Sequence, residues 1–220
     1  MGGCCSAGGA VGSQLESARN TNGLVLRGKN IRSVPAAAFD ITTLVKLDVA
    51  NNKLSMLPPE VGLLVALRVL DVRNNKLEAL PEELGACTAL ETLHAEQNQV
   101  AQLPESIGQL ASLRTLNLRG NRLNTVPASL SKCRSLRTLD LRSNCLYKLP
   151  YDIGALRALT QLALQFNPDM VCPPTCAYPT MPEVRRESVL HNGAAHIADM
   201  HGETTANLVR AQMMYILYAK

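Results

Sequence analysis

The chain repeats itself every 23 residues, and this repeat constrains its fold more than any other feature. A leucine marks each repeat, and a second aliphatic residue follows it two positions later. The marker leucines are Leu24, Leu47, Leu70, Leu93, Leu116, Leu139 and Leu162. Such a step predicts a short strand with both side chains inward. Because one repeat cannot bury its apolar face alone, we expect the repeats to stack into a solenoid of about seven parallel strands.

A polar column interrupts this apolar pattern. The position five residues after each marker leucine is asparagine from the second repeat on and Lys29 in the first. The asparagines are Asn52, Asn75, Asn98, Asn121, Asn144 and Asn167. We predict that each amide turns inward where its strand ends and satisfies buried backbone groups. Because an unpaired buried polar group costs roughly 1–3 kcal/mol, this ladder serves the fold.

The repeat has the form LxxLxLxxNxLxxLPxxIGxL, and residues 90–113 (LETLHAEQNQVAQLPESIGQLASL) match it closely. The pattern resembles the leucine-rich repeats of intracellular proteins in the Ras-suppressor group, over about residues 20–174. This resemblance implies an α/β solenoid, a horseshoe with a concave parallel β-sheet of about seven strands and short helical or 3₁₀ turns on the convex side. It also implies a binding scaffold, with a Ras-family GTPase or a phosphatase complex as partner.

The two ends of the solenoid need caps over their open apolar edges. Ser13 and Glu16 form a capping-box pattern, which predicts a short helix that carries Leu15 and Ala18. We therefore expect a flexible tether at 1–12 and a repeat domain at 13–174. Residues 175–220 are expected to form a helical C-terminal cap, with helices at 182–200 and 203–219. A partner-binding helix is the alternative for this segment.

The N-terminus carries a lipidation signal. The chain starts Met-Gly-Gly-Cys-Cys-Ser, which fits the N-myristoylation pattern with Gly2 as the acceptor. One myristoyl chain binds membranes only marginally, so palmitate on Cys4 and Cys5 is the expected second anchor. The opening segment also resembles small N-myristoylated leucine-rich-repeat proteins. These features predict a protein on the cytoplasmic face of a membrane, the plasma membrane in particular, with a cytoplasmic pool.

Composition argues against several other classes. The net charge of +4 is too small and dispersed to indicate nucleic-acid binding. We find no apolar run long enough for a transmembrane helix, no signal peptide and no Asn-x-Ser/Thr site. The seven cysteines are odd in number and lack framework spacing, which favours reduced thiols inside a cell.

The polar residues that alternate with the buried leucines predict a protein-binding concave face. The candidates are Arg27, Asp48, Asp71, Arg73, His94, Glu96, Asn117, Arg119, Asp140 and Arg142. Two hypotheses remain open for this face. Asp71 could pair with Arg73 and Asp140 with Arg142, which would leave a solvated, self-neutralised surface. Alternatively, the arginines bind an acidic or mixed-charge protein partner.

Candidates for chemistry are few. His94 and Glu96 could form an acid–base pair, but no nucleophile or metal set accompanies them. Cys87 and Cys133 occupy a core column, and Cys145 is expected to be exposed. A set with approximate zinc-finger spacing lies near the C-terminus, formed by Cys172, Cys176, His191 and His196.

The sequence therefore predicts a monomeric adaptor without enzymatic activity or cofactor, tethered to a membrane and binding a protein through its concave sheet. One alternative is a regulatory subunit of a phosphatase or small-GTPase complex that acts through its C-terminal helix. A distant alternative is a small metal-dependent protein that uses the C-terminal Cys/His set.

Overall fold

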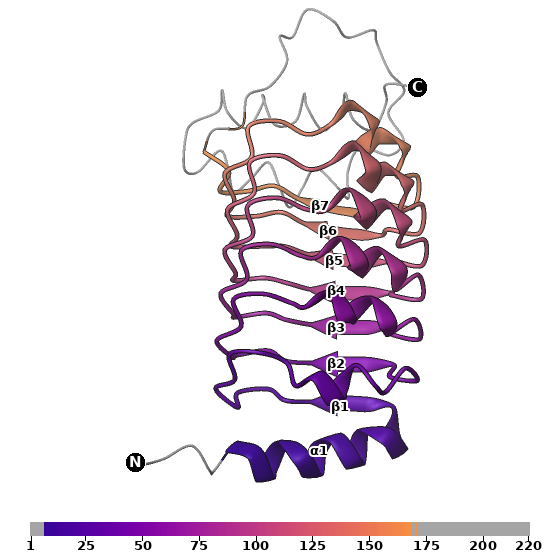
Figure 1. Cartoon of the computed structure of the whole chain (residues 1–220). Coiled ribbons are helices and arrows are strands. Elements are labelled where there is room, and N and C mark those ends of the chain that lie inside the picture. Colours follow the sequence, from indigo (N-terminus) through magenta and orange to yellow (C-terminus); the bar gives the residue numbers. More distant parts are fainter. Residues whose placement is uncertain (1–6, 169, 171–220) are drawn as a thin grey trace, which may run out of the picture.

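The computed structural model describes residues 7–168 and residue 170. Within them, seven three-residue strands form one parallel sheet whose order follows the chain (Figure 1). The strands are β1 (Gly23–Val25), β2 (Lys46–Asp48), β3 (Val69–Asp71), β4 (Thr92–His94), β5 (Thr115–Asn117), β6 (Thr138–Asp140) and β7 (Gln161–Ala163). The marker leucines lie in register, as Leu47 does opposite Leu24 and Leu70. One repeat thus makes one coil, numbered by its strand, and the predicted solenoid is confirmed.

In coils 1 to 6, a short 3₁₀ turn forms the side that lies opposite the sheet (Figure 1). These turns are η1 (Ala36–Ala38), η2 (Pro59–Leu63), η3 (Glu82–Ala86), η4 (Glu105–Gln109), η5 (Ala128–Lys132) and η6 (Tyr151–Ala155). Each turn follows a proline, such as Pro104 with φ −66°. Proline presets this φ and has no N–H to leave unpaired, so it suits the residue before a helical turn. The predicted convex turns are therefore confirmed.

The interior is a stack of aliphatic columns. The marker leucines of the middle coils, for example Leu93 and Leu116, are completely buried. Neighbouring convex turns approach each other closely. A Cβ atom added to Gly108 would lie only 2.4 Å from the carbonyl oxygen of Ser129. This contact explains the glycine at position 108, since a side chain there would push these two coils apart.

The asparagine column forms the predicted ladder. Asn121 Nδ2 donates to the carbonyl oxygens of Ala95 and Leu118, both at 2.9 Å, and its Oδ1 accepts from Val100 N–H at 3.0 Å. Each of the six asparagines makes the corresponding three bonds, two of which cross to the preceding coil. The ladder thus joins adjacent coils at the edge where the strands end.

The residue before each ladder position adopts a left-handed backbone conformation, a feature that the sequence reasoning missed. This column contains Gly28, Asn51, Asn74, Gln97, Gly120, Ser143 and Phe166, with φ between 52° and 68°. The left-handed residue redirects the chain so that the next side chain points into the coil. Glycine and asparagine tolerate this conformation well, whereas Phe166 adopts it against its intrinsic preference.

Helix α1 (Ala7–Thr21) covers the open end of the solenoid beside β1 (Figure 1). Ala18 is completely buried and Leu15 partly so, as predicted. The predicted start at Ser13 was wrong, because the helix begins at Ala7 and so includes residues 7–12 of the segment expected to be a flexible tether. Ala7 and Ala10 have a high intrinsic helix propensity. Each glycine in a helix interior costs roughly 1 kcal/mol, which makes this first segment the weakest part of α1.

The predicted helices at 182–200 and 203–219 and the domain boundary at residue 174 lie outside the described residues, as do Gly2, Cys4 and Cys5. In the part of the chain that the structure describes, no helix has the length and apolar character needed to cross a bilayer.

Candidate functional site: the concave face

The concave face consists of the side chains that flank the buried leucine on each strand, together with the side chain located two positions after the end of that strand. The sequence placed its charged groups in solvent, but the structure buries three of the acids. Asp48, Asp71 and Asp140 are only 6%, 3% and 7% exposed. Their carboxylates therefore need internal partners, because an unpaired buried charge is strongly unfavourable.

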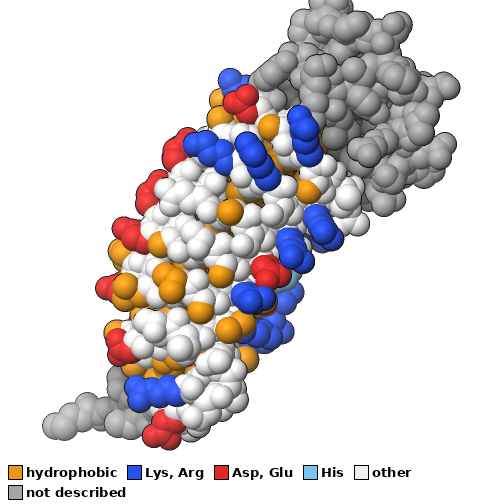
Figure 2. Space-filling view, turned by 90° about the vertical axis from the view of Figure 1, so that its right-hand side faces the viewer, with side chains coloured by type: hydrophobic (Ala, Val, Ile, Leu, Met, Phe, Trp, Pro, Cys, Tyr) orange, Lys and Arg blue, Asp and Glu red, His pale blue; other side chains and the backbone are white. Residues whose placement is uncertain are grey.

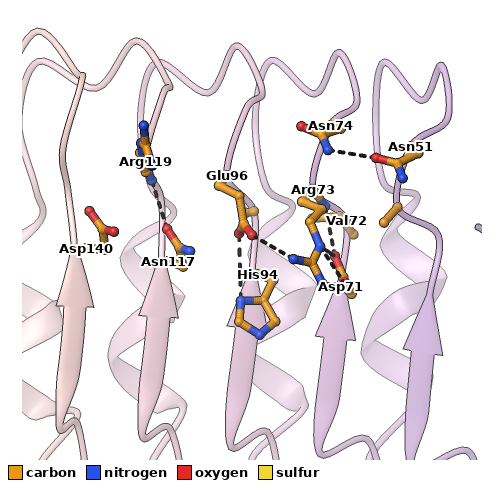
Figure 3. Close-up of polar contacts among 12 residues, drawn as sticks. Asn51, Asp71, Val72, Arg73, Asn74, His94, Glu96, Asn117, Arg119 and Asp140 are labelled. Atoms are coloured by element: carbon orange, nitrogen blue, oxygen red, sulfur yellow. Dashed lines mark hydrogen bonds and ion pairs between the residues drawn. The ribbon is translucent and has the colours of Figure 1, made fainter.

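The first part of this face contains a continuous chain of ion pairs across four coils. Figure 3 shows its later part, from Asp71 through Arg73 to Glu96. Arg27 contacts Asp48 at 3.3 Å and Asp71 at 3.0 Å. Arg73 contacts Asp71 at 2.7 Å and Glu96 at 3.3 Å. The hydrogen bond with Asp71 raises the pKa of Arg73, against the opposing effect of burial. The predicted pairing of Asp71 with Arg73 is confirmed, and it extends to neighbouring coils.

A second set of bonds ties the acids to their own coils. The Oδ1 atoms of Asp71 and Asp140 accept from the backbone N–H two residues later, at 3.2 Å and 3.1 Å. Asn117 makes the same bond to Arg119 N–H at 3.2 Å, and Asp48 makes it to Ala50 N–H at 3.1 Å. Asp and Asn favour this local turn, so the column could have been recognised from residue type. These side chains stabilise the ends of β2, β3, β5 and β6, a role that was not predicted from the sequence.

His94 and Glu96 end the ion-pair chain. His94 Nδ1 lies 3.7 Å from Glu96 Oε2, which is beyond hydrogen-bonding distance (Figure 3). The other oxygen of Glu96 is engaged by Arg73. Among the described residues, no group of three or more His, Cys, Asp or Glu side chains could hold a metal ion. The pair thus has the geometry of a polar surface contact, and the proposed zinc ligands lie outside the described residues.

Arg119 differs from the other arginines of the concave face. Arg142 is engaged by Asp140 through several contacts, and that hydrogen bond raises the pKa of its guanidinium. Arg119 is exposed, and in the described part of the chain its guanidinium makes no ion pair or hydrogen bond. Two positions before it in the same coil stands the uncharged Asn117, which lies in register with Asp140. Among the arginines of the face, those on either side are therefore ion-paired, and Arg119 is an available cation between them.

The cysteines of the described region behave as expected. Cys87 and Cys133 are completely buried, and each thiol donates a hydrogen bond to a backbone carbonyl of the preceding coil. Burial raises the pKa of both thiols to about 11. Cys145 is exposed. A thiol with such a high pKa is a poor nucleophile, so neither buried cysteine is suited to catalysis.

Comparison with solved structures identifies repeat proteins from different sources. The leucine-rich repeat domain of the type III effector XCV3220 (XopL) is 25% identical, with a TM-score of 0.69, over 76% of this chain and 60% of that one. A leucine-rich repeat protein of Leptospira interrogans, LIC12759, is 24% identical and shares the fold, with a TM-score of 0.53 over 73% of this chain and 56% of that one. The plant peptide hormone receptor RGFR1, in complex with RGF2, is 27% identical (TM-score 0.56; 60% and 22% covered).

This chain therefore spans from about a fifth to three fifths of those structures' lengths. A search of curated proteins finds no match. The leucine-rich repeat family model matches residues 42–100 and 111–168, which is more than half of the chain. Proteins of this family generally act in protein–protein interaction and are typically scaffolds without enzymatic activity. With its stacked coils, asparagine ladder and parallel sheet, this chain belongs to the leucine-rich repeat family.

Proposed function

We propose that this protein is a signalling adaptor that binds a protein partner through the middle of its concave face. The observation that carries the proposal is the uncommitted guanidinium of Arg119, which stands on a rigid sheet between two ion-paired regions. A partner carboxylate could pair with it bidentately. Because the asparagine ladder joins each coil to its neighbours, the sheet would lose little conformational entropy on binding. The likeness to a receptor solved with a peptide is consistent with this use.

The test is affinity capture from native membranes with wild type and Arg119→Glu as baits. Arg122→Glu is the matched control, because Arg122 is also exposed and lies in the same coil beyond the ladder. We expect a protein that is retained by wild type and Arg122→Glu and lost by Arg119→Glu. Arg73 and Arg142 should not be reversed in this experiment, since each neutralises a buried aspartate. Equal retention by all three baits would refute binding at the middle of the concave face.

We further propose that myristate on Gly2 and palmitate on Cys4 and Cys5 hold the adaptor at the cytoplasmic face of the plasma membrane. The N-terminal residue pattern supports this, and a Ras-family GTPase or a phosphatase complex at that membrane is the partner class suggested by the Ras-suppressor resemblance. Labelling with a myristate analogue should give a signal in wild type that Gly2→Ala abolishes. A Cys4→Ser/Cys5→Ser variant should keep the myristate label and shift to the cytoplasmic fraction. A Gly2→Ala protein that stays labelled and membrane-bound would refute the anchor.

A further inference from the structure

Charge is distributed unequally along the solenoid axis. Residues 44–105 contain five Lys or Arg and nine Asp or Glu, whereas residues 106–160 contain nine Lys or Arg and two Asp or Glu. In residues 106–160, acidic side chains neutralise few of the basic ones, because one of the two acids, Asp140, is buried against Arg142. A surface that serves only solubility usually intersperses both signs. The later coils therefore have a positive field that the earlier coils lack.

Five of these cations gather at the edge where the strands begin. We call this surface the basic rim and define it as Arg114, Lys132, Arg134, Arg137 and Arg157, all of which are exposed. Figure 2 faces this edge, with Lys and Arg side chains over the later coils and Asp and Glu side chains along the left margin.

Backbone bonds and a shared hollow place the members of the basic rim side by side. Arg114 and Arg137 directly precede β5 and β6, and Arg137 N–H donates to the carbonyl oxygen of Arg114 at 2.8 Å. Arg134 and Arg157 line one surface hollow of about 390 Å³ together with Ala155. Cations from three successive coils therefore face the same region of solvent.

The rim lacks the ion pairs that neutralise the same edge in earlier coils. There, Arg68 contacts Glu91 at 3.1 Å, in the column that continues as Arg114 and Arg137. Arg114 is 3.9 Å from Glu91, at the limit of an ion pair. Within residues 7–168, the other four rim side chains have no ion pair or side-chain hydrogen bond. Clustered like charges repel one another, so the arrangement stabilises an anionic ligand more than the fold itself.

We propose that the basic rim is the docking surface for an acidic protein segment rich in Asp and Glu. Four of its five cations are arginines, whose planar guanidinium groups match carboxylates bidentately. The rim has no aromatic side chain on which nucleic-acid bases could stack. Helix α1 begins at the opposite edge of the solenoid (Figure 1), so a membrane that held the N-terminus would lie away from the rim. This surface is distinct from the concave site around Arg119.

The test measures binding of a fluorescein-labelled octaglutamate peptide to the full chain by fluorescence anisotropy. The rim variant is Arg134→Glu/Arg137→Glu/Arg157→Glu. The matched control is Arg32→Glu/Lys53→Glu/Lys76→Glu, which makes the same change in net charge at three exposed cations of the earlier coils. We expect the rim variant to lose about tenfold or more in affinity and the control to lose less than about twofold. Wild-type binding should weaken as salt rises from about 50 to 300 mM.

Three outcomes would overturn the proposal. Equal losses in both triple variants would show that the peptide responds to net charge alone. Wild-type co-sedimentation with phosphatidylserine vesicles that the rim variant abolishes, with unchanged peptide binding, would make a membrane the occupant. A wild-type dimer that the rim variant converts to monomer would make a second copy the occupant. If the glutamate variant fails to fold, as judged by circular dichroism, Arg134→Gln/Arg137→Gln/Arg157→Gln replaces it with the same expected direction.

Discussion

Removal of one ladder amide tests how this solenoid is held together. Asn121 lies in coil 5 with coils on both sides, and it is only 7% exposed. In Asn121→Ala, Val100 N–H loses the bond that it makes to Oδ1. The carbonyl oxygens of Ala95 and Leu118 lose one donor each. The substitution therefore disturbs three backbone groups without changing any side chain on the surface.

The three lost hydrogen bonds contribute unequally to the expected change in the free energy of unfolding. Ala95 O still accepts from Asn98 Nδ2 at 3.1 Å, and Leu118 O still accepts from Asn144 Nδ2 at 3.0 Å. Only the N–H of Val100 is left without a partner, at a cost of roughly 1–3 kcal/mol, and each carbonyl loses about 0.5–1 kcal/mol. We therefore expect the free energy of unfolding to fall by about 2–5 kcal/mol, a large share of the ~5–15 kcal/mol typical of a domain.

Urea denaturation followed by far-ultraviolet circular dichroism measures this loss. The control is Asn124→Ala, three residues away, because Asn124 is exposed and makes only a weak bond to Thr125. Its effect should stay within about 0.5 kcal/mol. A loss below about 1 kcal/mol in Asn121→Ala, or one equal to the control's, would refute the idea that buried amides join the coils. An unchanged m-value would show that both variants unfold as the wild type does.

Three further outcomes follow from particular contacts. The carboxylate of Glu82 accepts hydrogen bonds from the N–H groups of Ser106 and Glu105, and these bonds hold the pKa of Glu82 below its ordinary value. The stabilisation by Glu82 should be present at neutral pH and be lost as the pH falls through that lowered pKa. Urea midpoints at pH 7 and pH 3 should therefore differ more in the wild type than in Glu82→Gln. Gly108→Ala should destabilise the protein by about 1–3 kcal/mol, because its Cβ would meet the adjacent turn, and an unchanged melting temperature would contradict this. Alkylation with peptide mapping should label Cys145 in the folded protein and the two buried cysteines only in urea, since burial raises the pKa of those thiols to about 11.

The fold could be predicted from the sequence because its periodic positions are constrained at every coil. The marker leucines and the ladder asparagines recur at fixed spacing, and one sequence column becomes one line through the structure. The left-handed column before the ladder was not predicted, because its occupants range from glycine to Phe166 and share no property. That column is defined by backbone geometry, which residue type alone does not reveal.

The concave face was harder to predict, because its side chains interact across coils. Asp71 pairs with Arg27, which lies 44 residues earlier in the sequence and two coils away. Sequence spacing suggested the local pair with Arg73 but gave no sign that Asp71 would be 3% exposed. Likewise, nothing in the identity of Arg119 distinguishes it from Arg73 or Arg142. Its availability follows from its neighbour Asn117, which replaces the aspartate present in coils 2, 3 and 6.

This last substitution suggests where function resides in a repeat protein. Buried columns must satisfy the same contacts in every coil, so they carry almost no information that distinguishes one repeat from another. Exposed columns are free to change. A change has a functional consequence where an acid that neutralises an arginine in other coils is missing. At Asn117 the acid that neutralises the concave arginine is lost, and after Glu91 the acids that neutralise the strand-start edge are lost. Both breaks fall in the later coils, so Arg119 and the basic rim lie in the same half of the solenoid, where a single acidic partner could engage both.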